Sequence, residues 1–334
     1  MAYTDFIPEN VAPLNTRRIS IYDSNGNRVG FIPLGSLTPP NHAQKMYSFG
    51  ALSDIHITQN TADSDFQKAL TYLNDSEDVA FTCICGDLTD TGTETQLAQY
   101  KAVVDAYSTD TPVYAIAGNH EATNEATTTA RIQPYTGQPL YYSFTHGNDV
   151  FIMVGEYRWN NSALFEDGEL QWLYETLEAN RNKRCFVFFH VFPWGDCGNA
   201  NSAYQNDLFS GTQGNVFKSL MAHYKNVTLF HGHSHFKFYL QEEDSKANYS
   251  NAFGYRSVHI PSLSVPRDIE DGARVDIYAD SEGYVVDVYE NGIHLRGRDF
   301  VKSEFLPIAS YWLDTTLQTV EAGTYTDSTG TITT

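Results

Sequence analysis

The stretch Tyr47-Ser-Phe-Gly-Ala-Leu-Ser-Asp54-Ile-His56 is a run of apolar and β-prone residues that ends in an aspartate and a histidine two residues apart. Such a run predicts a buried strand. A side chain at the carboxyl end of a buried strand is held rigidly and faces the edge of the sheet, where open α/β folds bind their ligands. The stretch therefore predicts both a strand of an α/β fold and a site at the end of that strand.

Four more polar clusters follow apolar runs in the same way. In chain order they are Gly86-Asp87-Leu-Thr-Asp90, Gly118-Asn119-His120-Glu121, the single His190 and Gly232-His233-Ser-His235. Taken alone, each cluster is more often an ordinary strand end, a core histidine or a surface turn. Aspartate, asparagine and histidine side chains that converge from separate strands, however, form sites for hard or borderline divalent metals. The five clusters together therefore predict a metal site.

Seven side chains in these clusters are candidate metal ligands: Asp54, His56, Asp87, Asn119, His190, His233 and His235. Seven ligands are too many for one tetrahedral ion, but they suit two ions about 3.5–4 Å apart that share a carboxylate. Such two-metal sites serve in-line displacement at phosphorus, because the cations hold both the nucleophile and the phosphoryl oxygens. We expect a phosphoester hydrolase with two divalent cations, and Mn, Fe and Zn all suit these ligands.

The order of the motifs resembles that of the calcineurin-like metallophosphoesterase superfamily: Asp-x-His, Gly-Asp-x-x-Asp, Gly-Asn-His-Glu, a single His and Gly-His-x-His. The resemblance covers about residues 46–300, since Tyr142-Ser-Phe and the segment 282–288 also resemble later strands of that superfamily. Asp87-Leu-Thr-Asp-Thr-Gly, followed by a helix that contains Tyr100, is closest in pattern to the bacterial cyclic-nucleotide phosphodiesterase branch.

The resemblance implies a role for each clustered residue. The first ion would be bound by Asp54, His56, Asp87 and His235. Asp87 would bridge to a second ion, which would also be bound by Asn119, His190 and His233. A hydroxide between the ions would attack the phosphorus in line. His120 would stabilise the phosphoryl oxygens and protonate the leaving group, oriented by the Asp90 carboxylate, although Asp90 could instead cap the following helix.

Departures from the superfamily patterns bear on the substrate. Thr91 stands where protein phosphatases of the superfamily carry an arginine that grips the phosphate. A diester has one charge fewer than a monoester dianion, so we expect a phosphodiesterase acting on a small molecule, with a small-molecule phosphomonoesterase as the alternative. Arg158, Trp159 and Trp194 either contact a substrate base or phosphate at the cleft or pack beneath loops.

The composition of the chain indicates which binding partners and which cellular compartment to expect. The net charge of −20 over 334 residues disfavours long nucleic acids and anionic membranes. The first residues lack the features of a signal peptide, no apolar run is long enough for a membrane span, and four cysteines without a disulfide pattern indicate a reducing compartment. We therefore expect a cytoplasmic location. Cys197 follows His190 closely enough to lie beside the site, and His231 either supports a ligand or is simply buried.

Strands and helices alternate along most of the chain, which predicts an α/β fold with a mixed two-sheet β-sandwich flanked by helices. Expected helices are 63–73, 94–107, 166–180 and 214–224, with a polar loop between the strands 113–117 and 140–144. We divide the chain into an N-terminal β hairpin and linker (1–45), a catalytic domain (46–300) and a Thr-rich C-terminal extension (301–334). These extensions could mediate homo-oligomers or assembly into a particle such as a phage, in which case the domain could be a scaffold with a residual metal site.

Overall fold

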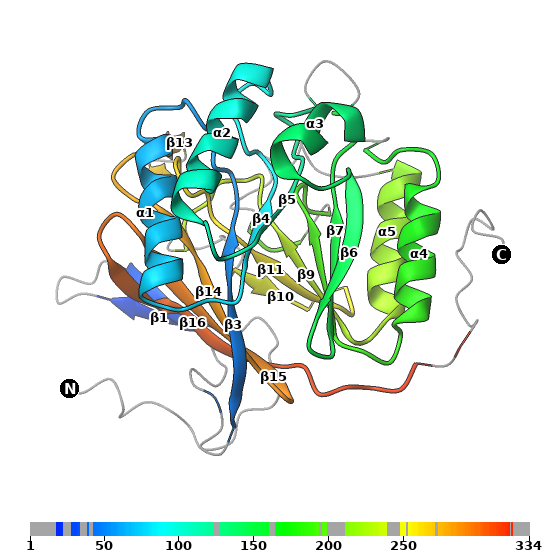
Figure 1. Ribbon diagram of the computed structural model, residues 1–334. Helices are drawn as coiled ribbons and strands as arrows, with labels where there is room; N and C mark the ends of the chain where they lie inside the picture. Colours follow the sequence, from blue (N-terminus) through cyan, green and yellow to red (C-terminus); the bar gives the residue numbers. More distant parts are fainter. Residues whose placement is uncertain are drawn as a thin grey trace.

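Two sheets packed face to face form the centre of the molecule, and helices cover the outer face of each (Figure 1). The computed structural model describes residues 18–22, 28–33, 39, 43–122, 127–159, 164–193, 196–198, 211–238, 248–251, 253–270, 273–320 and 322. This helix–sheet–sheet–helix arrangement confirms the predicted α/β sandwich. None of the helices in these ranges is long and apolar enough to cross a membrane.

The first sheet has six strands in the order β16-β15-β14-β3-β4-β5. Its parallel half contains β3 (Lys45–Leu52), β4 (Thr82–Cys85) and β5 (Val113–Ile116). Its antiparallel half contains β14 (Glu282–Tyr289), β15 (Gly292–Asp299) and β16 (Glu304–Asp314). The parallel strands therefore end at one edge of the sheet.

The second sheet also has six strands, in the order β10-β11-β9-β8-β7-β6. Four neighbouring strands are parallel: β7 (Asp149–Val154), β8 (Cys185–Phe189), β9 (Val227–His231) and β11 (Arg256–His259). The antiparallel strands β6 (Tyr141–His146) and β10 (Tyr249–Ser250) close its two edges.

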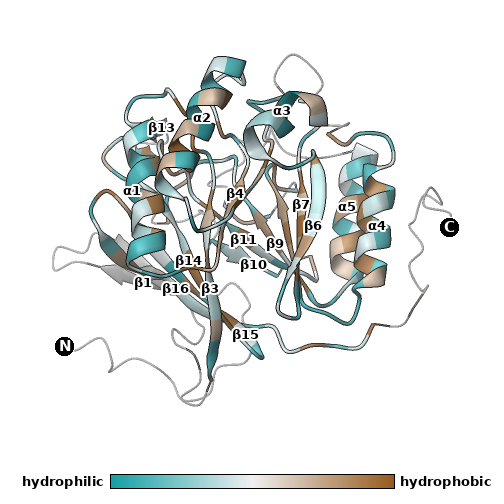
Figure 2. Cartoon of the chain, in the orientation of Figure 1, coloured by the Kyte–Doolittle hydropathy of each residue, from teal (hydrophilic) through white to brown (hydrophobic). Residues whose placement is uncertain are grey.

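The core between the sheets is largely aromatic. Phe49 of β3 contacts Phe151 of the other sheet edge to face, with ring centroids 5.2 Å apart, and it also contacts Phe186 at 5.6 Å. Apolar residues dominate the strands of both sheets, whereas the helices carry many hydrophilic residues (Figure 2). Burial of this continuous apolar layer is the main force that holds the two sheets together.

Two further apolar layers lie outside the sheets. Helices α1 (Ala62–Asp75) and α2 (Glu94–Tyr107) pack on the first sheet, with Phe66 and Tyr100 stacked at 5.7 Å. Helices α4 (Glu169–Ala179) and α5 (Gly211–His223) pack on the second sheet. All four helices were predicted from sequence, to within a few residues at their ends.

Some elements differ from the expectations. The polar loop between β5 and β6 contains helix α3 (Thr129–Thr136), whose only fully buried side chain is Ile132. An apolar face this small leaves no helical period in the sequence, and Pro134 inside the helix obscures it further. A short strand, β12 (Arg267–Glu270), pairs with β13 (Ala273–Asp276) and was also not predicted.

The two segments outside residues 46–300 also contain strands. Strands β1 (Arg18–Tyr22) and β2 (Arg28–Pro33) pair antiparallel, as the hairpin signature predicted. Strand β16 comes from the segment that we assigned to a C-terminal extension, and it pairs with β15 along the edge of the first sheet. The Thr-rich end, residues 323–334, lies outside the described residues. The division into three domains stays a prediction.

A buried ion pair joins the two sheets at the end opposite to the carboxyl ends of the parallel strands. The Arg184 guanidinium donates to both carboxylate oxygens of Asp149, at 2.9 and 2.6 Å, and both side chains are about 95% buried. Tyr47 of the first sheet donates to the same carboxylate at 2.6 Å, and Arg184 also donates to the carbonyl of Tyr289 at 2.6 Å. The network therefore links strands of both sheets.

We expect Arg184→Ala to lower the free energy of unfolding by about 3–5 kcal/mol, because it leaves the Asp149 carboxylate buried without its cation. Urea denaturation measures the change. Arg181→Ala is the matched control, since Arg181 is one-third exposed and pairs with Glu178 at the surface. Its effect should stay below about 1 kcal/mol. Equal losses in the two variants would contradict the role that we assign to the buried network.

Candidate metal centre

The five polar clusters gather where the parallel strands of both sheets end. Asp54 and His56 follow β3, Asp87 follows β4, and Asn119 and His120 follow β5. From the second sheet, His190 comes directly after β8, and His233 and His235 follow β9. The loops are bonded to one another: the Asp54 amide donates to Gly86 and the Gly232 amide donates to His190. The structure thus brings all the predicted site residues to one place.

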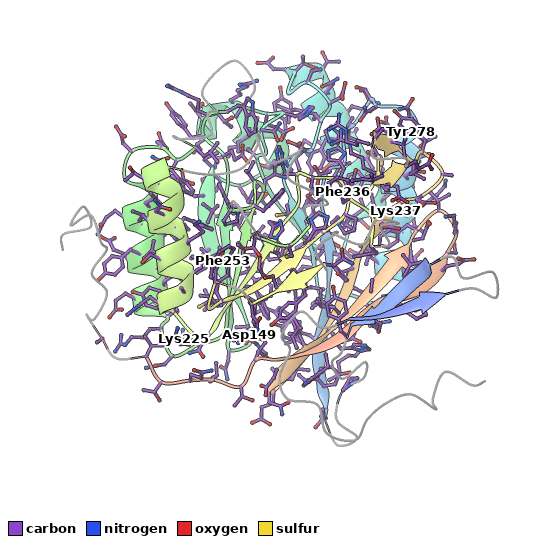
Figure 3. All side chains as sticks on the ribbon, turned by 180° about the vertical axis from the view of Figure 1, so that it is seen from behind. Asp149, Lys225, Phe236, Lys237, Phe253 and Tyr278 are labelled. Carbon is purple, nitrogen blue, oxygen red and sulfur yellow. The ribbon has the colours of Figure 1, made fainter. Side chains whose placement is uncertain are left out.

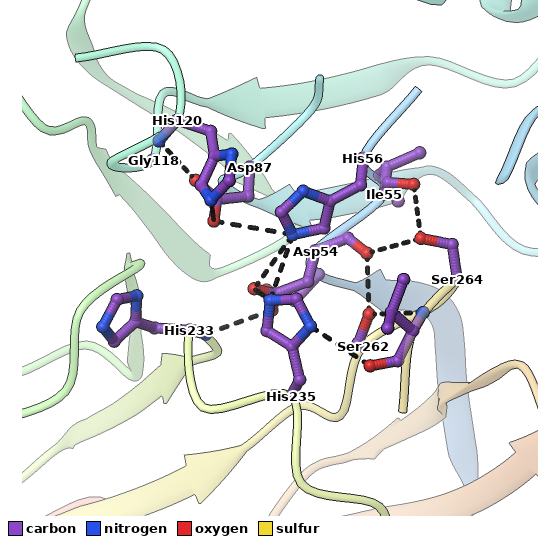
Figure 4. A network of polar contacts seen from close by, with 12 residues as sticks. Asp54, Ile55, His56, Asp87, Gly118, His120, His233, His235, Ser262 and Ser264 are labelled. Atoms are coloured by element: carbon purple, nitrogen blue, oxygen red, sulfur yellow. Dashed lines mark hydrogen bonds and ion pairs between the residues drawn. The ribbon is translucent and has the colours of Figure 1, made fainter. Parts of the chain in front are cut away.

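Five of the seven candidate ligands have a left-handed backbone conformation. Their φ angles are 53° at Asp54, 49° at His56, 49° at Asp87, 72° at His233 and 63° at His235. Residues other than glycine adopt this conformation at a cost of about 1–3 kcal/mol each, and they keep it only where the surrounding structure imposes it. Such strain is common at functional sites. In Figure 4 the side chains of Asp54, His56, Asp87 and His235 point toward one another, while the His233 ring lies to one side of them.

The first group of ligands consists of Asp54, His56, Asp87 and His235, each of which offers one atom within 4.8 Å of the others. The His235 Nε2 atom lies 3.0 Å from Asp54 Oδ1 and 3.0 Å from the Nε2 atom of His56. Asp54 is fully buried, yet its Oδ1 atom has no hydrogen bond of good geometry. Buried polar atoms are normally paired, so this arrangement fits a cation better than hydrogen bonding among the side chains.

The second group contains Asp87, His190 and His233, so Asp87 belongs to both groups. His190 Nε2 lies 3.1 Å from Asp87 Oδ2. The Asn119 side-chain oxygen lies 3.2 Å from that same nitrogen and 2.8 Å from His233 Nδ1. The carboxylate of Asp87 therefore stands between two sets of nitrogen and oxygen atoms.

Main-chain carbonyls set the orientation of two of the imidazoles. His190 Nδ1 lies 2.6 Å from the Cys85 carbonyl, and His235 Nδ1 lies 3.1 Å from the Val265 carbonyl. A ring nitrogen that faces a carbonyl carries the proton, so the lone pair of each Nε2 atom points into the site. A metal-binding histidine usually has such a partner. Gly86 is needed here as well, because a Cβ atom at this position would lie 2.6 Å from the ring of His190.

The charges of the site favour ionised carboxylates. Burial by itself raises the pKa of the Asp54 carboxyl, but the neighbouring imidazoles of His235 and His190 outweigh burial and hold that pKa well below its usual range. Burial lowers the pKa of His233 to about 3, so its imidazole is neutral. Ionised carboxylates and neutral imidazoles are the forms in which these side chains bind metals.

His120 lies beside both groups and is more accessible than the ligands, with 34% of its side chain exposed. Its Nε2 atom lies 3.9 Å from Asp87 Oδ2. Burial opposes protonation, but the charge of Asp87 and the contact with Asp90 raise the pKa of His120 above its usual value. An accessible imidazole that retains its proton suits a group that acts on a substrate.

Asp90 lies beside His120, as expected. His120 Nδ1 contacts the main-chain carbonyl of Asp90 at 2.5 Å, a bond that a sequence motif does not reveal. A carboxylate oxygen of Asp90 also lies within 4.8 Å of ring nitrogens of both His56 and His120. The role of the Asp90 carboxylate in orienting His120 stays a prediction.

Glu121 is a supporting residue whose role we did not predict. Its fully buried carboxylate accepts hydrogen bonds from the amides of Thr89 and Gly118, at 2.9 and 3.0 Å, and from the Thr89 hydroxyl at 2.8 Å. A longer bond of 3.3 Å comes from the Leu88 amide. Glu121 therefore ties the loop of Asp87 to the loop of Asn119 and His120. Its place in the Gly-Asn-His-Glu cluster pointed to it, but its partners are visible only in the structure.

The remaining candidates lie around this centre. The Trp159 ring is half-buried, with its centroid 5.5 Å from that of His233, while the exposed Arg158 lies over the Tyr157 ring at 5.7 Å. Trp194 lies outside the described residues. His231 is fully buried and contacts Cys197 rather than either ligand group.

Comparisons with known proteins concern the family and the fold of the chain. A family model described as calcineurin-like phosphoesterase matches residues 47–237. No curated protein sequence matches the chain. Among solved structures, the purple acid phosphatase PPD1 from yellow lupin (Lupinus luteus) seeds aligns over 87% of this chain with a TM-score of 0.55 and 15% identity. The alignment spans 58% of the lupin chain, and at this identity the likeness concerns the fold alone. GAP50, named as the anchor in the inner membrane complex of Plasmodium, aligns over 84% of this chain and 91% of its own, with a TM-score of 0.49 and 14% identity.

We expect Glu121→Ala to destabilise the protein by at least about 3 kcal/mol, because each buried donor left without an acceptor costs about 1–3 kcal/mol. Glu121→Gln keeps one acceptor oxygen and should have a smaller effect. Urea denaturation measures both, with Glu175→Ala on the exposed face of α4 as the control. If Glu121→Ala were as stable as the control, Glu121 would not tie the two loops together.

Proposed function

The chain belongs to the calcineurin-like phosphoesterase family, and on this premise we propose that it hydrolyses a small phosphodiester with two divalent metal ions. The observation that carries the proposal is the pair of ligand groups that share the buried carboxylate of Asp87. This donor set contains only carboxylate, amide and imidazole atoms, which suits Mn, Fe or Zn.

The residues divide into two binding sets. We assign one ion to Asp54, His56, Asp87 and His235, and the second ion to Asp87, Asn119, His190 and His233. When bound, two such ions lower the pKa of a bound water and neutralise the charge on the phosphoryl oxygens. The chain itself orients these ligands and buries five of the seven side chains.

His120 is the residue that we assign to the leaving group. With Nδ1 bonded to the Asp90 carbonyl, a protonated His120 would donate from Nε2 to an oxygen of the substrate. The proton would pass to the ester oxygen as its bond to phosphorus breaks. Asp90 would then act as a positioning residue through its main chain.

The preference for a diester rests on the loop after Asp90. Thr91 stands in place of the arginine of protein phosphatases, and its hydroxyl and amide both contact Gln96 at 2.8 Å. A substrate with one negative charge needs less positive charge at this position than a monoester dianion does. The net charge of −20 further supports a small substrate over a long nucleic acid.

Turnover of cyclic nucleotides, aryl diesters and aryl monoesters, measured separately with Mn, Fe and Zn, tests the proposal. We expect the highest kcat/KM for a diester. Faster turnover of monoesters would replace the diester assignment with a phosphomonoesterase. Protein that retains no metal at Asp87 and turns over none of these esters would favour a scaffold in an assembly.

His120→Ala should leave the metal content of the two sites that share Asp87 unchanged. It should lower kcat about 10²–10⁴-fold, which is the usual contribution of a general acid. Metal analysis and steady-state kinetics of the same preparation measure the two effects. Loss of metal from this variant would show that His120 is a ligand instead.

Asp87→Ala should reduce the metal content of both sites at once, because this carboxylate lies in both groups. Asn119→Ala is the matched comparison, since Asn119 contacts only the second group in our assignment. It should affect one ion more than the other. Retention of both ions in Asp87→Ala would contradict the shared carboxylate.

A further inference from the structure

A second cluster of metal-binding side chains lies outside the site described above. Asp196, Cys197 and His231 are buried, and each offers a ligand atom within 4.8 Å of the others. None of the three belongs to the groups that contain Asp54 or Asp87. The proposed hydrolysis uses none of them.

The cluster is built on the carboxyl ends of two neighbouring parallel strands. His231 is the last residue of β9 and His259 is the last residue of β11, and the two are paired in register. Their rings lie side by side, with centroids 5.6 Å apart. The segment 196–198, which follows His190 in the chain, lies against both rings.

The spacing of the donor atoms matches tetrahedral zinc. The Cys197 Sγ atom lies 3.4 Å from His231 Nε2. With a Zn–S bond of about 2.3 Å and a Zn–N bond of about 2.0–2.1 Å, a tetrahedral ion separates its sulfur and nitrogen ligands by about 3.5 Å. Asp196 is held nearby by the Cys197 amide, at 2.8 Å, and by the Tyr255 hydroxyl, at 2.9 Å.

His259 lies beside the cluster but does not belong to the group of ligand atoms that lie within 4.8 Å of one another. Its Nε2 atom lies 2.9 Å from the Phe236 carbonyl and therefore carries the ring proton, which leaves a lone pair on Nδ1. Nδ1 is buried and has no hydrogen-bond partner. It faces the segment of Cys197, because a Cβ atom added to Gly198 would lie 2.5 Å from it. Buried polar atoms normally have a hydrogen-bond partner, and the lone pair of this nitrogen has none.

Charge and ligand type also favour zinc at this cluster. A thiolate and a carboxylate together balance one divalent cation, so the loaded site would be neutral among buried side chains. Thiolate and imidazole favour zinc, whereas sites that hold only oxygen and nitrogen ligands discriminate less among Mn, Fe and Zn.

We propose that Cys197, His231 and Asp196 form a separate zinc site that links the segment after His190 to the ends of β9 and β11. Binding would displace the thiol proton to solvent and form a Zn–S bond, with no change of oxidation state. The Ser234 hydroxyl donates to the Gly198 carbonyl at 2.5 Å, so the linked segment also contacts the loop that carries His233 and His235.

Cobalt substitution of the full chain tests the proposal without measuring activity. Co²⁺ bound by a thiolate has a sulfur-to-metal charge-transfer band in the near ultraviolet, and the site around Asp87 contains no sulfur ligand. We expect this band in the wild-type protein, together with three metal ions per chain. Cys197→Ser should lose the band and one ion. Cys185→Ser, which removes a buried thiol outside the cluster, should keep both.

Two further measurements keep the result independent of folding defects and of the proposed function. Asp87→Ala should retain the band even where it loses the other ions. X-ray absorption of the zinc-loaded wild-type protein should reveal a sulfur neighbour at about 2.3 Å, whether or not Cys197→Ser folds. Absence of both the band and the sulfur neighbour would overturn the proposal, as would a band that persists in folded Cys197→Ser.

Discussion

Two fully buried carboxylates, Asp54 and Asp87, are the constraint on which the rest of this structure depends. An isolated carboxylate in a protein interior is costly, so it must be surrounded by groups that favour its charge. Here the surrounding groups are imidazoles, and they come from strands of both sheets. The position of the two sheets relative to each other is therefore also a requirement of the site.

The loops around these carboxylates are held in strained conformations by bonds that do not involve the ligand atoms. Ser262 and Ser264 donate to the carbonyl of Asp54, at 3.0 and 3.3 Å, and Glu121 accepts amides from two loops. The opposite end of the sandwich carries the buried pair of Arg184 and Asp149, which joins the sheets by ordinary ionic contacts (Figure 3 labels Asp149). The strained residues of the site thus lie at the carboxyl ends of the strands, whereas the ion pair that stabilises the packing of the two sheets lies at the opposite end.

Much of the fold and of the candidate site could be predicted because the signals are local. Apolar runs such as the one that ends at Asp54 indicate buried strands, and polar residues at their ends indicate a site. Helix α3 was not predicted because Ile132 is its only fully buried side chain. Strand β16 was assigned to an extension because the local pattern does not reveal that it pairs with β15. The bond from His120 to the main-chain carbonyl of Asp90 was not predicted for a different reason, since every residue possesses such a carbonyl.

The chemical groups of the site follow from the amino-acid sequence: carboxylates, imidazoles and an amide at the ends of buried strands, in an order that identifies the family. These are properties of side chains and of local periodicity, which a chain carries before it folds. Which atoms lie within bonding distance depends instead on how the strands pack. That packing placed Asp87 in both ligand groups and turned the Nε2 atoms of His190 and His235 inward. It also set Cys197 against His231, 34 residues away along the chain, because two parallel strands and the loop above them end at the same edge.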